Sequence, residues 1–337
     1  MAQIVTNQLS TTNTKLSVIK SPPTIKLRRT LKGHFGKVTA FHWSGDSKHL
    51  VSAGQDGNLL IWNTVTSNKM QSIPLNSSYV MSVGMEQTKG NLVACGGLDN
   101  LCTIYPRNAP EKAVEMVNHD GFVSCCRFLD EKEILTASGD STCIRWDIST
   151  GRPISTFAEH TADAISISIK DRTVFASCSV DRTVKIWDLR TPDTAVQSYI
   201  GFHTADVNDV EFMTTDMNCF ATCCQDNIVR LFDMRAYNQL SSYSSGAVSG
   251  ADASIPDDGM TSLSFSRSGR IIFTGQADGT VYGFDVLSTP KKAGQKHSSP
   301  AFTLPQAHER HVSCVGVSPS GEALCTSSWD GLLKIWA

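Results

Sequence analysis

Histidine, serine or threonine, and aspartate recur along the chain in a fixed order. His34, Ser52 and Asp56 make up the first set, and a His precedes an Asp by 21 to 23 residues in five places. Serine, histidine and aspartate can form a hydrolytic triad, in which the histidine takes a proton from a nucleophilic hydroxyl. A triad is needed only once, whereas this set recurs in one register. The repetition favours buried hydrogen-bond relays and predicts that the protein is not an enzyme.

Tryptophan extends the set, because an aromatic residue lies six positions after each of these aspartates. We expect the Asp to cap a turn, the His to donate to it, the hydroxyl to bridge, and the indole N–H to end the relay. Four complete relays are predicted: His34, Ser52, Asp56 and Trp62; His119, Thr136, Asp140 and Trp146; His160, Ser177, Asp181 and Trp187; and His308, Thr326, Asp330 and Trp336.

Three repeats depart from this pattern. Repeats 2 and 6 lack the His, and Tyr105, Phe232 and Phe284 replace Trp in repeats 2, 5 and 6. An aromatic ring without the indole N–H cannot end the relay in the same way. These repeats are expected to hold a weaker relay or none, and to depend more on packing.

The relay residues lie on short β-prone hairpins. The closing stretch TSSWDGLLKIWA (326–337) contains an Asp-Gly turn between two strand-like runs, which is a strong hairpin signal. Equivalent hairpins place Asp at 56, 99, 140, 181, 226, 278 and 330, with spacings of 43, 41, 41, 45, 52 and 52. A period in the low forties is typical of the four-stranded blade of a β-propeller. The predicted fold is all-β, a seven-bladed β-propeller.

The two ends of the repeat region have complementary strand counts. The last repeat stops one residue after Trp336 and has only three strands, while the run at 25–31 (IKLRRTL) has no partner of its own. Pairing them would close the ring and remove two sheet edges. We therefore expect residues 25–337 to form one propeller. Residues 1–24 show no 3.5- or 3.6-residue apolar period, so they are expected to form a flexible tail without a coiled coil.

Composition excludes several other classes. A net charge of −2 and a pI near 6.5 leave no basic footprint for nucleic acid. No apolar run approaches the roughly 20 residues of a membrane span, and the ends carry neither a signal-peptide core nor a lipidation Cys, so direct membrane insertion is not expected.

The eleven cysteines do not form a ligand pattern. Cys219 and Cys223 come nearest to zinc-site spacing, but no His or second pair accompanies them. Most lie in strand-like runs and are expected to be small buried residues in a reducing compartment. No metal or cofactor is predicted. Two long connections, 241–258 and 287–305, produce the two 52-residue spacings and are expected to be disordered or functional surface loops.

Two sets of equivalent positions vary between the repeats and are candidates for determining which partner is bound. Three residues after the His position stand Lys37, Phe122, Asp163, Asp206 and His311, and immediately before the turn Asp stand Gln55, Leu98, Gly139, Val180, Gln225, Ala277 and Trp329. Both registers should lie near the loops of one face, around the central channel. An aromatic anchor such as Trp329 within a polar surround is the usual anatomy of a protein-binding hot spot. The alternative is that Trp329 simply packs over its own hairpin.

The chain resembles the β subunits of heterotrimeric G proteins, a family of WD-repeat proteins. The resemblance runs from about Arg28 to Trp336. It is carried by RRTLKGH (28–34), FHW (41–43), SAGQDGNLLIW (52–62), VACGGLDNLCTIY (93–105), SCCRFLD (124–130), SGDSTCIRWDISTG (138–151), LSFSRSGR (263–270) and SSWDGLLKIW (327–336). It implies a non-catalytic transducer whose narrow face binds the GDP-bound α subunit and downstream effectors, and which couples receptors to effectors together with a γ subunit.

The resemblance also implies which residues contact the α subunit and effectors, where this chain keeps the family's residue types. They are Lys37, Asn68, Lys69, Met81, Leu98, Asn100, Asp163, Asp206 and Trp329. Six further contact positions depart from the family pattern: Thr39, Asn58, Tyr79, Phe122, Val180 and Gln225.

The N-terminus departs further, because the family usually opens with a helix that forms a coiled coil with γ. Here the tail is shorter and unpatterned, as in divergent fungal members, so γ would have to bind the side of the propeller around blades 5 to 7. Such a protein would be cytoplasmic and held at the inner face of the plasma membrane by its partners.

A different class of scaffold fits one short motif. WDLR (187–190) and FDMR (232–235) resemble the motif of substrate receptors for cullin-based ubiquitin ligases. Trp-Asp-x-Arg also arises readily at the end of a blade, so the motif is compatible with either class. Binding that depends on the nucleotide of an α subunit would distinguish them.

Overall fold

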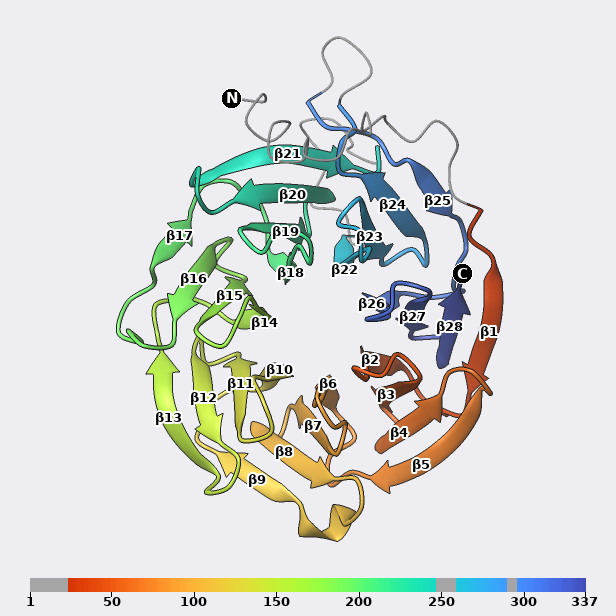
Figure 1. Ribbon diagram of the computed structural model, residues 1–337, viewed down its shortest axis with the longest axis vertical. Coiled ribbons are helices and arrows are strands. Elements are labelled where there is room, and N and C mark those ends of the chain that lie inside the picture. Colours follow the sequence, from red (N-terminus) through yellow and green to blue (C-terminus); the bar gives the residue numbers. More distant parts are fainter. Residues whose placement is uncertain (1–23, 247–258, 290–295) are drawn as a thin grey trace.

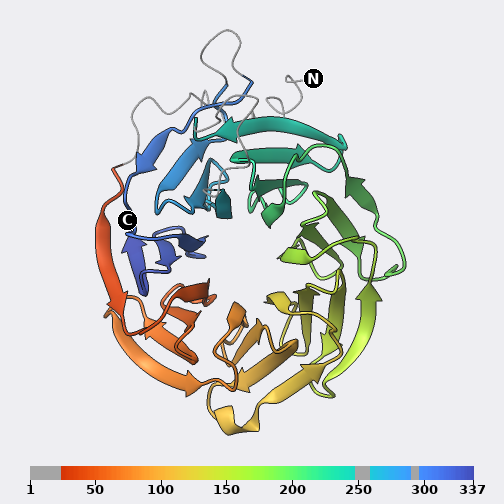
Figure 2. The same ribbon diagram turned by 180° about the vertical axis from the view of Figure 1, so that it is seen from behind.

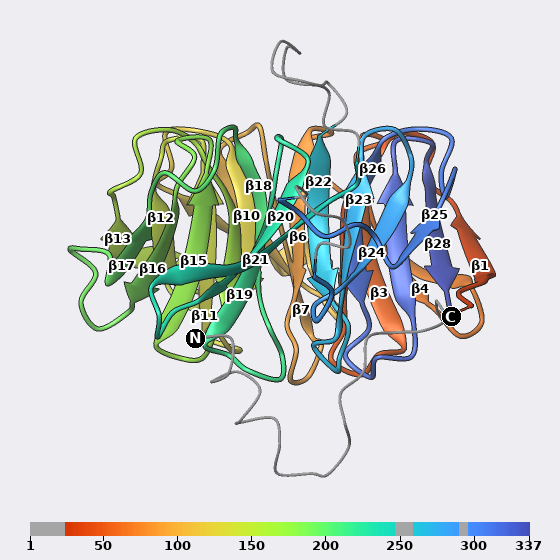
Figure 3. The ribbon, with the colours of Figure 1, turned by 90° about the horizontal axis from the view of Figure 1, so that it is seen from above.

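The computed structural model describes residues 24–246, 259–289 and 296–337. Their strands form seven sheets of four antiparallel strands each, arranged as blades around one axis (Figure 1). The innermost strands surround the axis when the ring is seen from behind (Figure 2), and the strands run between two opposite faces (Figure 3). This is the predicted seven-bladed β-propeller. The predicted tail at 1–24 lies almost entirely outside the described residues.

Blades 1 to 4 each take four consecutive strands, ordered from the axis outwards. Their bounds are β2 Val38–Trp43, β3 His49–Gly54, β4 Asn58–Asn63 and β5 Asn68–Pro74; β6 Val80–Met85, β7 Leu92–Gly97, β8 Leu101–Pro106 and β9 Val114–Val117; β10 Val123–Phe128, β11 Glu133–Ser138, β12 Cys143–Asp147 and β13 Arg152–Phe157; and β14 Ala164–Ile169, β15 Val174–Ser179, β16 Val184–Asp188 and β17 Gln197–Tyr199. A single 3₁₀ turn among the described residues, η1 Pro110–Lys112, precedes β9.

Blades 5 to 7 follow the same plan. Their bounds are β18 Val207–Phe212, β19 Cys219–Cys224, β20 Ile228–Asp233 and β21 Asn238–Ser244; β22 Met260–Phe265, β23 Ile271–Gln276, β24 Val281–Asp285 and β25 Phe302–Leu304; and β26 Val312–Val317, β27 Leu324–Ser328 and β28 Leu332–Trp336. The interpretation of 241–258 and 287–305 as loops was wrong at two points. Residues 241–244 complete β21, and β25 lies inside the second stretch; each supplies the outermost strand of its blade.

Blade 7 is completed from the other end of the chain. β1, Leu27–Lys32, pairs antiparallel with β28, from Leu27 opposite Trp336 to Lys32 opposite Leu332. Lys26 and Ala337 exchange two further backbone hydrogen bonds of 3.1 Å each. The strand predicted at 25–31 is therefore found at 27–32, and its partner is the one that the strand count indicated.

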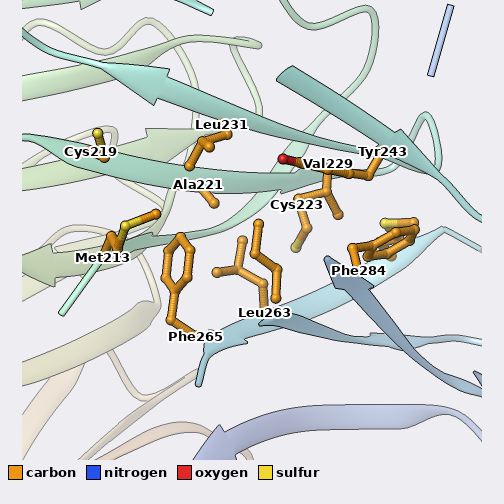
Figure 4. Packing of buried hydrophobic residues seen from close by; sticks show 12 residues of the cluster. Met213, Cys219, Ala221, Cys223, Val229, Leu231, Tyr243, Leu263, Phe265 and Phe284 are labelled. Atoms are coloured by element: carbon orange, nitrogen blue, oxygen red, sulfur yellow. The ribbon is translucent and has the colours of Figure 1, made fainter. Parts of the chain in front are cut away.

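The core lies between neighbouring blades rather than at the axis. In the cluster of Figure 4, Ala221, Cys223 and Leu231 of blade 5 face Leu263 and Phe265 of blade 6. Middle strands such as β19 are buried along their whole length, whereas an outermost strand such as β5 is mostly exposed. Buried strands therefore read as nearly continuous apolar runs, and cysteines serve there as small apolar residues.

Two backbone features recur in all seven blades and present side chains on one face. The residue after each turn Asp has a positive φ, from 61° at Asn227 to 88° at Gly279, which explains the Gly and Asn found there. A register shift interrupts the start of every innermost strand, as between Val38 and Ala40. Such a bulge redirects the extra side chain. We call the face that carries the seven Asp turns the Asp-turn face.

Candidate functional site

The relay of blade 4 shows how the recurring polar residues meet. His160 Nδ1 lies 2.9 Å from an Asp181 oxygen, and His160 Nε2 lies 2.7 Å from Ser177 Oγ. Because the carboxylate can only accept, Nδ1 carries the proton and Nε2 accepts from the serine. Trp187 Nε1 donates to the same Ser177 oxygen at 2.8 Å. Ser177 is fully buried, so its hydroxyl has both partners and no access for a substrate.

Blades 1, 3 and 7 contain the same hydrogen bonds. The His–Asp, His–hydroxyl and Trp–hydroxyl distances are 3.0, 2.7 and 2.8 Å for His34, Ser52, Asp56 and Trp62; 2.7, 2.7 and 2.8 Å for His119, Thr136, Asp140 and Trp146; and 2.9, 2.7 and 3.0 Å for His308, Thr326, Asp330 and Trp336. Four equal sets in one register are structural elements of the blades, not four catalytic centres.

Two of the relay carboxylates, Asp140 and Asp181, are favoured in the ionised form. Burial pushes the pKa of Asp181 upward, but hydrogen bonds from His160 and Thr183 outweigh it, and the pKa lies well below its ordinary value. Asp140 has its pKa lowered by the same balance, with His119 and Thr142 as the donors. Burial lowers the pKa of His34 against the opposing effect of Asp56.

In blade 5 a guanidinium group lies between the histidine and the turn Asp. His203 Nε2 lies 3.3 Å from the Thr222 hydroxyl, but its other nitrogen faces Arg230 Nη1 at 3.2 Å instead of a carboxylate. Arg230 pairs with Asp226 at 3.1 and 2.7 Å. Burial, followed by the Arg230 charge, lowers the pKa of His203 to about 3. Sequence reasoning predicted a weaker relay here and missed the arginine.

Blades 2 and 6 lack the relay. In blade 6 the fully buried Thr274 hydroxyl has no hydrogen-bond partner among the described residues. In blade 2, Cys95 takes the hydroxyl position and Tyr105 the Trp position, and both are buried. Packing of Tyr105 against Val93 and Met85 in one apolar cluster takes over the role of the indole.

The two variable registers meet on the Asp-turn face. In each blade, the residue before the turn Asp donates its backbone N–H to the carbonyl of the residue that directly precedes the innermost strand. The pairs are Gln55–Lys37, Leu98–Tyr79, Gly139–Phe122, Val180–Asp163, Gln225–Asp206, Ala277–Gly259 and Trp329–His311. The variable residues therefore lie in adjacent pairs around one face. The sequence predicted that both registers share a face, but not that they pair.

Trp329 is the best-defined side chain of this ring. Lys37 Nζ, from the neighbouring blade 1, lies 3.8 Å from the centroid of its ring, which is a cation–π contact. The His311 ring lies 4.2 Å from the Trp329 ring, centroid to centroid. Burial and the Lys37 charge lower the pKa of His311. Trp329 thus contacts a residue of the neighbouring blade and is 39% exposed, so its packing is not confined to its own hairpin.

The other predicted contact residues fall into two groups. Met81 and Leu98 are 43% and 52% exposed on the Asp-turn face, Met81 because it is the bulged residue of β6. Asn100, Asp163 and Asp206 lie on the same face, the acids on blades 4 and 5 across the ring from Lys37 (Figure 1).

Asn68 and Lys69 are not brought together with the other seven residues. They begin β5 and pair with Asn63 and Trp62, at the end of the hairpin opposite the Asp56 turn. The structure thus separates a face set of seven residues from a lateral pair on blade 1.

Two aromatic residues belong to the Asp-turn face besides the face set of seven. Phe35 is 94% exposed and donates its backbone N–H to Asp56 at 3.0 Å, and Tyr79 is 58% exposed. The residue after the relay His is polar in blades 3, 4, 5 and 7, namely Asp120, Thr161, Thr204 and Glu309. That contrast was available in the sequence and would have identified Phe35 as a surface residue.

Two partly buried acidic residues of β18 join blade 5 to blade 6. Asp209 accepts the Leu263 N–H at 3.0 Å and Glu211 accepts the Phe265 N–H at 3.3 Å. Burial, then the neighbouring Asp209, raises the pKa of Glu211 to about 8. Both acids are engaged in holding blades together.

The Trp-Asp-x-Arg motifs form local turns. Arg190 binds Asp188 through two nitrogens, at 2.9 and 2.5 Å, and Arg235 binds Asp233 and Asp216 at 2.8 and 2.9 Å. These ion pairs give the motif a structural role within the blade. In the described part of the chain no group of three or more His, Cys, Asp or Glu side chains could hold a metal ion. No helix of the described residues is long and apolar enough to cross a membrane.

Seven four-stranded blades, four of them with a buried His–Ser/Thr–Asp–Trp relay, define a WD-repeat β-propeller. The sequence matches the family described as "G protein beta WD-40 repeat protein" over residues 5–337. The chain belongs to that family, and it is a non-catalytic propeller protein.

Named relatives span most of the chain. The guanine nucleotide-binding protein subunit beta of Oryza sativa subsp. japonica is 39% identical over 97% of this chain and 87% of its own length. Subunit beta-2 of Nicotiana tabacum is 40% identical over 96% and 86%. The subunit beta of Dictyostelium discoideum is 44% identical over 93% and 85%. The predicted resemblance is confirmed for the family; a fungal origin stays a prediction.

Proposed function

We propose that the protein is the β subunit of a heterotrimeric G protein, which binds the GDP-bound α subunit through the Asp-turn face. The family match over residues 5–337 is the observation that carries this proposal. In this function the chain holds α in its GDP state, and release of α exposes the same face to effectors. A γ subunit would bind the side of the propeller, and α and γ would keep the protein at the inner face of the plasma membrane.

The chemistry of the face supports this assignment. Trp329, Leu98 and Met81 expose apolar surface next to charged groups. Buried aromatic anchors surrounded by polar side chains dominate protein–protein affinity. Trp329 is pre-oriented by Lys37 and His311, so little side-chain freedom is lost on binding. The lateral pair, Asn68 and Lys69, would meet a second segment of α beside blade 1.

Retention of a purified α subunit on the immobilised full-length chain tests the proposal. We expect preferential retention of α loaded with GDP over α loaded with a non-hydrolysable GTP analogue. Trp329→Ala should weaken binding of the GDP form by roughly 2–4 kcal/mol, a factor of about 30 to 1,000, as for other central aromatic anchors.

Ile154→Ala is the matched control, because Ile154 is similarly exposed, at 48%, but lies on the outermost strand β13. It should bind α like the parent chain. Binding without nucleotide dependence, together with an unaffected Trp329→Ala variant, would overturn the proposal and return attention to the ubiquitin-ligase receptor class.

A further inference from the structure

A cavity marks the place in blade 2 where the relay is missing. It is lined by Cys95, Asp99, Thr103, Tyr105 and Glu115, among others, and it opens to solvent. Asp99 is the turn Asp of this blade, and Leu98 and Asn100 flank it on the Asp-turn face. The cavity is therefore an opening next to the ring of variable residues.

Three substitutions create the space. The relay His stands four residues before the innermost strand, and in blade 2 that position is Asn76. Asn76 is exposed, and its amide points to Glu115 at 3.4 Å instead of entering the blade. Cys95 and Tyr105 replace the hydroxyl residue and the tryptophan, and Tyr105 is the smaller of the two aromatic residues. Neither His nor indole fills the gap beside Asp99.

Blade 2 also carries a second carboxylate at this point. Cys95, Thr103 and Glu115 lie side by side across β7, β8 and β9. In the six other blades the outermost residue of this cross-strand row is a serine or threonine: Ser72, Thr156, Ser198, Ser242, Thr303 and Thr30. The acid at position 115 is therefore specific to the blade that has the cavity.

A threonine of the wall offers its hydroxyl to the cavity. Thr103 is 6% exposed and lines the cavity, and no hydrogen bond of its hydroxyl is found within the described part of the chain. The hydroxyl oxygen can therefore accept a hydrogen bond from a ligand with N–H donors. The cavity thus offers acceptors on several sides and two negative charges.

Blade 5 shows which group fits such a place. Arg230 pairs with Thr222 across the sheet just as Thr103 pairs with Cys95, so the two residues hold the same position. Arg230 is 5% exposed, and its guanidinium forms a two-pronged ion pair with Asp226, the counterpart of Asp99. The blade plan therefore accommodates a guanidinium beside the turn Asp.

We propose that the blade 2 cavity binds a guanidinium group, held between Asp99 and Glu115 with the Thr103 hydroxyl as a further acceptor. The planar guanidinium carries five donors and suits two carboxylates better than an ammonium, which is a point charge. The group is either a small free guanidinium compound or the arginine side chain of a protein seated on the Asp-turn face. The inference does not depend on the proposed function.

Titration of the methyl-labelled full-length protein with methylguanidinium, followed by NMR, tests the site. We expect saturable shifts of the Thr103 methyl signal with a dissociation constant on the order of a millimolar, about −4 kcal/mol. Methylammonium at equal ionic strength should give much smaller shifts. A capped Gly-Arg-Gly peptide distinguishes the sources: binding as tight as methylguanidinium indicates an arginine side chain, and absence of binding indicates a free compound.

Four variants sharpen the test. Asp99→Asn and Glu115→Gln, both at exposed residues, should each weaken methylguanidinium at least tenfold, and Thr103→Arg should fill the cavity and abolish binding. Arg230→Thr is the positive control, because it opens the corresponding space in blade 5 and should create a second site. Equal shifts with methylammonium, or shifts that survive Glu115→Gln and Asp99→Asn unchanged, would overturn the proposal.

Discussion

Blades 4 and 2 have the same four-stranded plan but contrasting interiors. Blade 4 connects Asp181, His160, Ser177 and Trp187 through hydrogen bonds of 2.7 to 2.9 Å. Blade 2 has none of these bonds and contains a cavity beside its turn Asp. Even so, both pair their strands antiparallel with the same early bulge in the innermost strand. Strand pairing and interblade packing are therefore sufficient for the blade, and the relay adds to them.

The contrast also shows what the relay prevents. In blade 4 every polar group of the relay has a partner inside the blade, and the Trp187 ring packs edge-on to Phe157 and is stacked with Phe175. In blade 2 the Asp99 carboxylate lines the cavity. Blade 2 thus keeps the fold without the relay and leaves its turn Asp beside an opening.

The largest change in the free energy of unfolding is expected from a substitution that makes blade 4 resemble blade 2. His160→Asn shortens the side chain, so that Ser177 and Asp181 lose their shared partner in a buried site. We expect the free energy of unfolding to fall by about 2–4 kcal/mol, because buried donors and acceptors are left unsatisfied. Equilibrium unfolding in urea measures the change.

The matched change in blade 2 is Asn76→Ala, at an exposed residue in the corresponding position. It should alter the free energy of unfolding by less than about 0.5 kcal/mol, as surface substitutions usually do. Equal losses in the two variants would mean that the relay has no special weight in blade 4.

A smaller loss of folding stability is expected at acidic pH. The pKa of Asp140 and that of Asp181 are depressed in the folded protein, so the unfolded chain takes up protons first as the pH falls. Their contribution is fully present above pH of about 5 and is lost below it. His34, with its pKa lowered by burial, acts in the same direction below pH of about 6.5. Stability should therefore decline steadily from pH 6.5 downwards, as urea unfolding at several pH values would measure.

The variant His160→Asn sharpens this prediction. Without His160, Asp181 loses one of the donors that lower its pKa. The loss of stability between about pH 5 and pH 3 should then be shallower than in the parent chain. An identical slope would show that the His–Asp contact contributes nothing to the acid sensitivity.

Sequence reasoning predicted the features that recur in every repeat and those that follow from counting the strands. Seven turn aspartates predicted the blades, and the missing fourth strand predicted that 25–31 pairs with the last repeat, which the structure has as 27–32 with 332–336. Features that depend on register across strands were missed. Arg230 reaches Asp226 only because β20 places it on the same side of the blade. Glu115 faces the cavity only through the pairing of β8 with β9. The contact of Lys37 with Trp329 joins the first and last blades of a closed ring.

The smallest effect is expected from trying to restore the relay in blade 2. Asn76→His alone should change the free energy of unfolding by less than about 0.5 kcal/mol, because the Cys95 thiol is a weak hydrogen-bond acceptor and donor. The double variant Asn76→His/Cys95→Ser supplies a histidine partner for Asp99 and a hydroxyl partner for that histidine, and should stabilise by about 1 kcal/mol, the value of a typical net hydrogen bond. Cys95→Ser alone is the control and should destabilise, since it buries an unpaired hydroxyl. Stabilisation by the double variant beyond the sum of its single changes would show that the relay acts as a unit, whereas strict additivity would show that its hydrogen bonds are independent.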